Sequence, residues 1–254
     1  MGRARKALGG RIDGLAKWLL RFRVISVPSR LIANSSYAWS FISRTDRIRA
    51  NRLRDRIKHE ELPEHVSIIM DGNRRFAWGK NLGREIGHTH GKEKLKEVMD
   101  WILDLGIPYF TVYALSTENL KERSEDELEG LFDLYVAGLN EIADDPKIHE
   151  NGVKVQAVGR LSLLPDRVRE ALKNAESRTE DYSDFLFTIC LAYGGREEIV
   201  DAVRDVAVAH SEGDLSIEMI DQHQISSRLY TSGLPDPDLV IRTSGEERVS
   251  NFLL

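Results

Sequence analysis

An acid and two arginines directly follow a short apolar segment in the first third of the chain. Residues 66–70 have the composition of a buried parallel strand, and the next residues are Asp71, Gly72, Asn73, Arg74 and Arg75. In an open α/β sheet, ligands bind at the carboxyl ends of the strands. A carboxylate beside amides and guanidinium groups that favour an anion indicates a divalent metal bridging to a phosphate. The alternative is an ordinary Asp-Gly turn with solvated arginines, and the spacing alone leaves both open.

A second cluster of the same kind lies at residues 238–254. A short strand of buried composition is predicted at residues 239–241, and hydroxyl residues and a glycine then lie between Arg242 and Arg248. Guanidinium groups, hydroxyl donors and a glycine are typical of an anion-binding loop. The spacing is that of neither a P-loop nor a dinucleotide fingerprint, so a nucleotide is not predicted. Together the clusters predict two phosphorylated substrates held side by side; the alternative is a polar surface loop with an Arg242–Glu246 ion pair.

Strand-like and helix-like segments alternate between these two clusters. Further strands are predicted at residues 107–115, 153–158, 185–192 and 238–241, and helices at residues 92–105, 124–143, 165–177 and 196–210. Gly106 is expected to end the first of these helices, and Ser124 followed by Glu127 predicts a capping box at the start of the second. The alternation predicts an α/β fold with an open, mostly parallel sheet flanked by helices.

Five motifs follow one another along residues 62–254: HVSIIMDGNRRFA, GREIGHTHG, YALSTENL, LAYGGREEIVDAV and IRTSGEERVSNFLL. In this order they resemble the cis-prenyltransferases, the family of undecaprenyl and dehydrodolichyl diphosphate synthases. The STEN segment, residues 159–165 and the long amino-terminal extension are more similar to archaeal or eukaryotic members than to bacterial ones.

The resemblance implies a reaction and a fold. Isopentenyl diphosphate would attack an allylic diphosphate, farnesyl or geranylgeranyl, as pyrophosphate leaves with the help of Mg²⁺, and the new double bond would be cis. The product would be a long-chain polyprenyl diphosphate for a glycosyl carrier lipid, grown inside a hydrophobic tunnel. The alternative is a non-catalytic partner subunit of a heteromeric enzyme; such subunits lose the acid and basic residues that this chain keeps at Asp71, Arg75, Arg84 and His88.

Roles for individual residues follow from the resemblance alone. Asp71 matches the catalytic acid and metal ligand, and Asn119 matches the residue assigned to proton removal. The residues that match substrate-binding positions are Gly72, Asn73, Arg74, Arg75, Phe76, Arg84 and His88 for the allylic diphosphate, Ser116, Thr117, Glu118, Leu120 and Arg123 in a loop that closes over the substrates, and Arg242, Arg248, Val249 and Ser250 for isopentenyl diphosphate. The apolar side chains expected in the tunnel wall are Leu128, Leu131, Phe132, Leu134 and Tyr135, although an ordinary core face explains them equally well.

The end of the chain departs from the family pattern. Members of the family continue past the NFLL sequence with a segment that carries a second acidic metal ligand. We therefore expect residues 61–254 to be a catalytic domain whose carboxy-terminal end is missing. One carboxylate with diphosphate oxygens and waters would bind Mg²⁺, but more weakly than two carboxylates.

Residues 1–60 are predicted to form a basic amphipathic helical extension. They contain 15 Lys or Arg and 4 Asp or Glu, although the whole chain has a formal net charge of -5. Residues 15–26 combine arginines with apolar and aromatic side chains, which suits a helix lying in an anionic membrane interface. A helix packed on its own domain and a disordered arm are the alternatives. Basic charge without a recognisable module does not predict nucleic-acid binding.

The composition fits a cytoplasmic enzyme, a homodimer by resemblance, with peripheral membrane contact through residues 15–26. A chain of 254 residues with 41% hydrophobic content can bury a substantial core. Its one cysteine, Cys190, lies in an apolar run and is expected to be a buried thiol in a reducing compartment. The chain has no apolar run of the length that a transmembrane helix requires.

Overall fold

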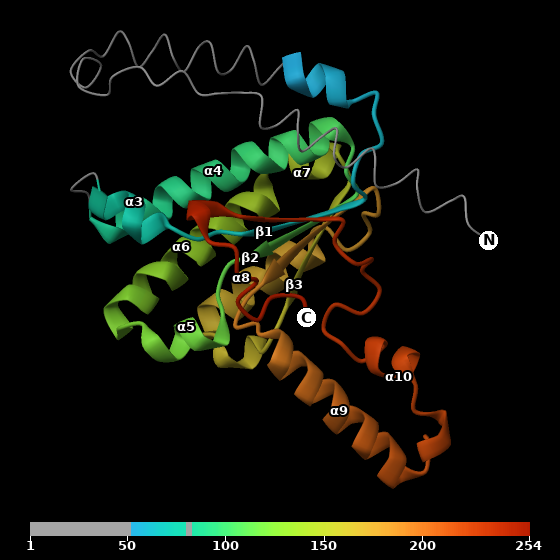
Figure 1. Ribbon diagram of the computed structural model, residues 1–254. Helices are drawn as coiled ribbons and strands as arrows, with labels where there is room; N and C mark the ends of the chain where they lie inside the picture. The colour runs from blue at the N-terminus through green and yellow to red at the C-terminus, as the bar shows by residue number, and fades with distance from the viewer. Residues whose placement is uncertain (1–51, 80–82) are drawn as a thin grey trace, which may run out of the picture. The chain divides into compact units, whose positions relative to one another are not determined.

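The computed structural model describes residues 52–79 and 83–254 (Figure 1). The chain divides into two compact units, Met1–Arg56 and Ile57–Leu254. Residues 52–57 are helical. Residues 15–26 and most of the predicted amino-terminal extension lie outside the described residues, so the expected membrane contact stays a prediction. The fold below is that of the second unit.

Five parallel strands form one sheet in the order β3-β4-β2-β1-β5. The strands are β1 (His65–Ile69), β2 (Tyr109–Tyr113), β3 (Val153–Val158), β4 (Phe185–Cys190) and β5 (Leu239–Arg242). The predicted parallel α/β sheet is therefore confirmed. Because all strands run the same way, their carboxyl ends meet at one edge. The neighbouring strands β1 and β5 are paired so that Ile69 lies opposite Arg242, which brings the two predicted clusters together.

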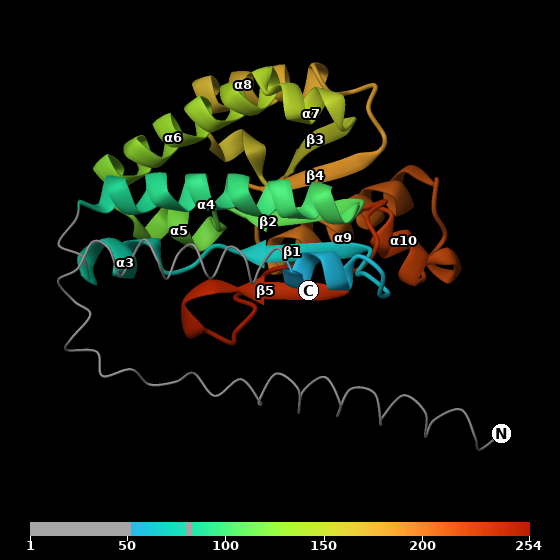
Figure 2. The same cartoon turned by 90° about the horizontal axis from the view of Figure 1, so that it is seen from above.

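Helices cover both faces of the sheet. They are α3 (Asn73–Gly79), α4 (Arg84–Leu105), α5 (Thr117–Glu122), α6 (Glu125–Asp144), α7 (Pro146–Glu150), α8 (Asp166–Ser177), α9 (Gly195–Glu212) and α10 (Gln222–Ser226). Figures 1 and 2 show α4, α6 and α8 over one face and α9 with α10 on the other. Among the described residues, no helix combines the length and the apolar character that a membrane span requires.

The helix boundaries agree only partly with the predictions. Gly106 ends α4 as expected: its φ of 71° is left-handed, and its amide donates to the carbonyls of Ile102 and Leu103. However, α4 begins at Arg84, eight residues before the predicted start. Ser124 does precede α6, but its side chain makes no cap hydrogen bond, so that half of the predicted capping box is wrong.

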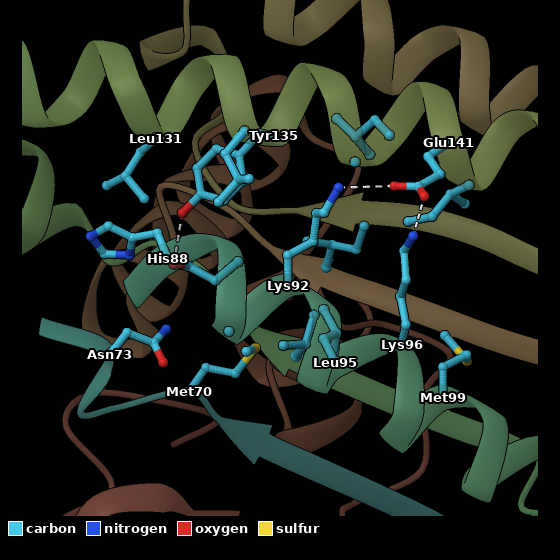
Figure 3. Close-up of a pocket in the computed structure, with 18 of the residues that line it drawn as sticks. Met70, Asn73, His88, Lys92, Leu95, Lys96, Met99, Leu131, Tyr135 and Glu141 are labelled. Carbon is cyan, nitrogen blue, oxygen red and sulfur yellow. Dashed lines mark hydrogen bonds and ion pairs between the residues drawn. The ribbon is translucent and has the colours of Figure 1, made fainter. Parts of the chain in front are cut away.

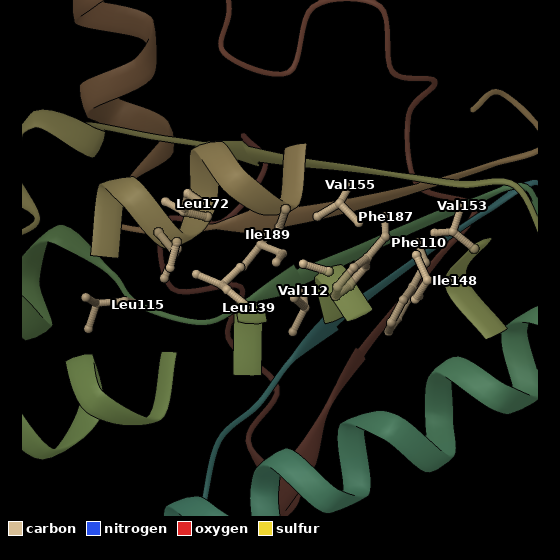
Figure 4. Packing of buried hydrophobic residues seen from close by; sticks show 14 of the residues in the cluster. Phe110, Val112, Leu115, Leu139, Ile148, Val153, Val155, Leu172, Phe187 and Ile189 are labelled. Carbon is tan, nitrogen blue, oxygen red and sulfur yellow. The ribbon is translucent and has the colours of Figure 1, made fainter. Parts of the chain in front are cut away.

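The main core lies between the sheet and the helices α4, α6 and α8 (Figure 4). Phe110 and Phe187 stack at its centre with ring centroids 5.4 Å apart, on neighbouring strands. Cys190 is fully buried, as predicted. The prediction that residues 239–241 form a buried strand is wrong: these residues keep 45, 42 and 40% of their surface. The physical reason is that β5 is the edge of the described sheet and pairs with β1 alone there.

Candidate active site

The ends of β1 and β5 merge the two predicted clusters into one site. The Arg242 guanidinium donates a hydrogen bond of 2.8 Å from Nη2 to Asp71 Oδ2, although the two residues are 171 positions apart. The same guanidinium donates through Nη1 to Ser250 Oγ at 2.6 Å. The alternative Arg242–Glu246 pair is wrong, because Glu246 pairs with the exposed Arg248 at 3.2 Å. The acid after β1 and the basic loop after β5 therefore belong to one site.

Asp71 is held as a carboxylate. Its Oδ1 accepts a hydrogen bond of 2.6 Å from the Gly72 amide and lies 3.4 Å from Arg75 Nη2. Burial by itself would raise the pKa of Asp71, but the hydrogen bonds from Arg242 and from the Gly72 amide hold the pKa below its ordinary value. The side chain keeps 30% of its surface exposed. The carboxylate is thus charged at neutral pH and accessible to a ligand.

Hydrogen bonds join the turn after β1 to the loop after β5. The Asp71 amide donates to Thr243 Oγ1 at 2.9 Å, and the Thr243 hydroxyl donates back to the Asp71 carbonyl at 2.5 Å. Gly72 has a φ of 93°, and a Cβ there would lie 2.5 Å from the Cβ of Ser244. Arg75 donates to the hydroxyl of Ser244. Only glycine fits at position 72, and its absent side chain lets the two loops touch.

A cluster of basic side chains surrounds a buried carboxylate where α3, α4 and α6 meet. Arg123 Nη1 donates to Glu127 Oε1 at 2.7 Å, and Arg74 Nε lies 3.7 Å from the same oxygen. His88 Nε2 lies 3.8 Å from it, which is beyond hydrogen-bond range. Burial and the Arg123 charge lower the pKa of His88, so its imidazole is neutral at pH 7. This cluster predicts a site for an anion, because the positive groups outnumber the one carboxylate.

Unsatisfied donors support the same conclusion. Among the described residues, the buried nitrogens that lack a hydrogen-bond partner include His88 Nε2, Arg123 Nε and Arg242 Nε. Buried polar groups are nearly always paired in native proteins. Three such nitrogens around the end of β1 therefore indicate that a polar ligand completes the site.

Glu127 is the functional residue that the sequence reasoning missed. It was assigned to a capping box, whereas in the structure its side chain is 7% exposed and anchors Arg123 one turn earlier on the chain. The signal was present in the sequence, because Arg123 and Glu127 are four residues apart, the spacing of neighbours on a helix surface.

The STEN segment begins a short helix, α5, where the sequence predicted a loop. The predicted closure over the substrates stays a prediction. Ser116 caps this helix by accepting a hydrogen bond of 3.0 Å from the Asn119 amide. Thr117 is buried, and the Glu118 carboxylate accepts a hydrogen bond of 3.0 Å from the Asn251 amide group. The first turn of α5 is thus tied to the loop that carries Arg242, and the roles predicted for Asn119 and Glu118 stay predictions.

The remaining predicted residues lie in different settings. Asn73 begins α3, and its side chain is packed against Gly91 of α4. A Cβ built on Gly91 would lie 2.6 Å from the side-chain nitrogen Nδ2 of Asn73. Phe76 and Val249 are exposed, and Leu120 is half-buried against the core. Arg84 opens α4, but its side chain lies outside the described residues. The structure therefore gathers the Asp71, Arg74, Arg75, His88, Arg123, Arg242 and Ser250 side chains. The roles of these residues and of the others stay predictions.

A cavity of about 440 Å³ begins at this site and extends between α4 and α6 (Figure 3). Its mouth includes Asp71 and His88, and its interior is lined mainly by apolar side chains of α4, α6 and the sheet, such as Leu95, Met99 and Phe187. The volume is that of an ordinary small-molecule site. An apolar tunnel that starts among cations suits a substrate with an anionic head and a hydrocarbon tail.

The predicted tunnel wall is correct for three of its five residues. Leu131, Leu134 and Tyr135 line the cavity, and the Tyr135 hydroxyl donates to the Ala114 carbonyl at 2.9 Å. Phe132 instead belongs to the buried core, as the alternative interpretation held, and Leu128 packs beside it. The wall residues lie on the face of α6 that is turned to α4.

The sequence matches a known family over the region that builds this site. The family model for undecaprenyl diphosphate synthases, a prenyltransferase family, matches residues 69–254. The chain belongs to this family. It is 51% identical over 202 residues to the tritrans,polycis-undecaprenyl-diphosphate synthase (geranylgeranyl-diphosphate specific) of Methanopyrus kandleri, which covers 80% of this chain and 74% of the relative. The enzyme of the same name from Methanocaldococcus jannaschii is 49% identical over 206 residues, or 80% of this chain and 72% of the relative.

Solved structures of prenyl diphosphate synthases have the same fold. The crystal structure of lavandulyl diphosphate synthase from Lavandula x intermedia, in complex with dimethylallyl diphosphate, is similar with a TM-score of 0.71 and 33% sequence identity. The match covers 76% of this chain and 82% of that one. The resemblance found in the five motifs and the α/β fold that it implied are therefore confirmed.

The acid at the mouth suits one position in the coordination shell of a metal ion. In the described part of the chain, no three His, Cys, Asp or Glu side chains lie together in a way that could hold a metal. Asp71 is charged and partly exposed, and it lies near the buried nitrogens of His88, Arg123 and Arg242 that lack a hydrogen-bond partner. Mg²⁺ is commonly bound by one or two carboxylates together with substrate phosphates and waters. The residues present therefore fit Mg²⁺ delivered with a diphosphate.

Proposed function

We propose that this chain is a cis-prenyltransferase that condenses isopentenyl diphosphate onto geranylgeranyl diphosphate and repeats the addition to give a long polyprenyl diphosphate. The observation that carries the proposal is a cavity whose mouth is cationic and whose interior is apolar. Membership in the family and the printed specificity of the two archaeal relatives support the choice of starter. The sequence motifs alone leave farnesyl diphosphate open as well.

The allylic diphosphate would be bound at the mouth by Arg74, Arg75, Arg123 and His88. Their charges and hydrogen bonds stabilise the negative charge that grows on pyrophosphate as the allylic bond breaks, which is the difficult step of the reaction. His88 is neutral and can donate one ring proton to a phosphate oxygen. Mg²⁺, held by Asp71, supplies further neutralisation of the diphosphate charge when it is bound.

Isopentenyl diphosphate would be bound by the loop after β5. Arg242, Arg248 and Ser250 supply its donors, and Arg242 already contacts Asp71. The two diphosphates would then lie on either side of the Asp71–Arg242 pair, so the nucleophilic double bond is held near the allylic carbon. Such positioning converts a reaction of two molecules into one within a complex.

Several finer features belong to the same proposal. We propose that the product serves as a glycosyl carrier lipid, that Asn119 orients the path of the departing proton, and that the enzyme is a cytoplasmic homodimer with peripheral membrane contact through residues 15–26. These features rest on the family resemblance and on the sequence.

An elongation assay tests the proposed reaction. The purified chain is incubated with geranylgeranyl diphosphate, labelled isopentenyl diphosphate and Mg²⁺, and we expect labelled polyprenyl products that disappear on chelation. Asp71→Asn should lower turnover about a hundredfold or more, because it removes a preorganised charge at the site of pyrophosphate loss. The matched control is Asp166→Asn, on the exposed first turn of α8.

Two results would contradict the proposal. One is full turnover by Asp71→Asn. The other is a wild-type chain that binds both diphosphates but releases no labelled product; if that chain instead activated a second prenyltransferase subunit, the alternative of a non-catalytic partner would replace the proposal.

A further inference from the structure

Charged side chains interrupt the apolar lining of the tunnel at two places beyond its mouth. Asp100, Asp145 and Lys147 lie toward the far end, where Lys147 pairs with Asp100 at 2.7 Å. Lys92 and Lys96 of α4 and Glu141 of α6 line the cavity between its mouth and that end (Figure 3). We call them the seam latch. An apolar chain gains nothing from an ammonium or a carboxylate group, and burying such groups is costly. Their place in the wall of a hydrocarbon tunnel therefore requires an explanation.

The latch joins α4 to α6 across the cavity. Lys92 Nζ donates to Glu141 Oε2 at 3.0 Å, and Lys96 Nζ donates to the other carboxylate oxygen. The side chains of Lys92, Lys96 and Glu141 keep 23, 40 and 41% of their surface exposed. The ion pairs thus stand where the tunnel wall meets solvent, and they close a seam that apolar side chains leave open.

Gly138 explains why a charged side chain reaches this place. It lies on α6 one turn before Glu141 and lines the cavity without a side chain of its own. A Cβ built on Gly138 would lie 3.7 Å from Cδ of Lys92, and apart from its chain neighbours and the backbone of α6 no other heavy atom of the described residues lies within 4 Å of it. The hydrocarbon stem of Lys92 therefore covers the gap at Gly138, while its ammonium group is fixed by Glu141. The stem of a lysine is long and has several rotatable bonds, so it can move aside more easily than a packed apolar side chain.

The latch lies at a defined depth in the tunnel. Measured along α4 at 1.5 Å per residue, Lys92 lies about 6 Å and Lys96 about 12 Å beyond His88 at the mouth. Leu103, which also lines the cavity, lies about 22 Å beyond His88 by the same measure. A growing tail would pass the closed seam before it reaches the far end.

We propose that the seam latch closes the side of the tunnel and thereby limits the length of the product. This inference rests on the proposed elongation reaction. While the latch is closed, the tail is confined to the cavity, and elongation slows when the cavity is full. A tail can leave through this side of the tunnel only by separating the ion pairs that Glu141 makes with Lys92 and Lys96.

Product length is the measurement that tests the latch. Lys92→Ala and Glu141→Gln open the seam, and we expect the main product to become longer by at least one isoprene unit. Gly138→Leu fills the gap from the opposite helix, and we expect shorter products. The matched control is Lys94→Ala on the same helix, because Lys94 pairs with Glu97 and does not line the cavity; its product distribution should equal that of the wild type.

The outcomes separate the latch from the reaction itself. Elongation by all variants with the wild-type length distribution would overturn the latch and leave the proposed function intact. If the wild-type chain did not elongate, the proposed function would fail, and a binding measurement would still decide the latch. In that case a length series of prenyl diphosphates is titrated into each variant: Lys92→Ala should bind the longest members at least tenfold tighter than the wild type, and equal affinities would overturn the inference.

Discussion

The two faces of the sheet differ in one respect. The face under α4, α6 and α8 holds the main core and, beside it, a cavity of about 440 Å³ between α4 and α6. The other face is filled by aromatic rings: Tyr113 and Phe252 stack 4.7 Å apart, and Tyr193 meets both of them edge to face. Strands alternate their side chains between faces, so residues next to each other in sequence, such as Val112 and Tyr113, belong to different environments. The first face therefore combines a packed core with a cavity, whereas the aromatic cluster fills the second.

Hydrogen bonds that are buried around Glu198 and partly buried around Asp201 add to the rigidity of the filled face. Glu198 is 2% exposed and accepts hydrogen bonds from the Tyr193 hydroxyl at 2.5 Å and from the amide and the hydroxyl of Thr231 at 3.0 Å each. Arg160 pairs with Asp201 through two bonds of 2.9 Å. Fully satisfied polar networks of this kind fix a unique arrangement. A sheet can therefore hold an open cavity on one face when its opposite face is firmly packed.

The largest expected effect on stability comes from the filled face. Phe252→Ala removes a ring that is 1% exposed and should lower the free energy of unfolding by about 3–5 kcal/mol. Urea denaturation followed by circular dichroism measures this change. A loss below about 1 kcal/mol would mean that the filled face yields as readily as the cavity face.

A smaller effect should depend on pH. The hydrogen bonds from Arg160 hold the pKa of Asp201 at about 2, below the ordinary value of 3.8. A depressed pKa in the folded state stabilises the protein above pH 3.8, and this contribution is lost as the pH falls from 3.8 towards 2. Asp201→Asn should therefore destabilise the chain at neutral pH, and the difference from the wild type should shrink over that acid range. A difference that stays constant with pH would contradict the assigned pairing.

The smallest effect is expected on the cavity face. Leu134 lines the cavity and is half-buried, so Leu134→Ala should lower the free energy of unfolding by about 1 kcal/mol or less, because few contacts are lost. The control is Leu172→Ala in the packed core, where a side chain that is 2% exposed should cost about 2–5 kcal/mol. Equal losses at both positions would show that the two environments do not differ in packing.

Much of the fold could be predicted from the sequence because its elements carry local signals. The strand at residues 153–158 and the stop at Gly106 agree with the structure, since alternation and a glycine C-cap act within a few residues. The short helices α5, α7 and α10 were not predicted. Each has seven residues or fewer, too short for a periodic pattern, and they depend on caps such as Ser116 and Asp145 and on tertiary contacts.

The site could be predicted only in part, for a related reason. Asp71 and Arg242 were expected to lie together because both follow strands of a parallel sheet, and the five motifs strengthened that expectation. The seam latch was not predicted, because Lys92 and Glu141 are 49 residues apart and each has the composition of an ordinary exposed helix position. Pairings of that kind depend on how two helices are set side by side, which no local pattern encodes.

The reciprocal hydrogen bonds between Asp71 and Thr243 have a consequence for repeated reaction cycles. They fasten the turn that carries the acid to the loop that carries Arg242, so the proposed binding sites for the two diphosphates are held at a fixed spacing. The cavity proposed for the tail lies elsewhere, between α4 and α6. Under the proposed reaction, every round of addition therefore starts from the same spacing of the reacting ends, whatever number of units the lipid already contains. Under the proposed reaction, the geometry of bond formation is thus independent of the length of the tail.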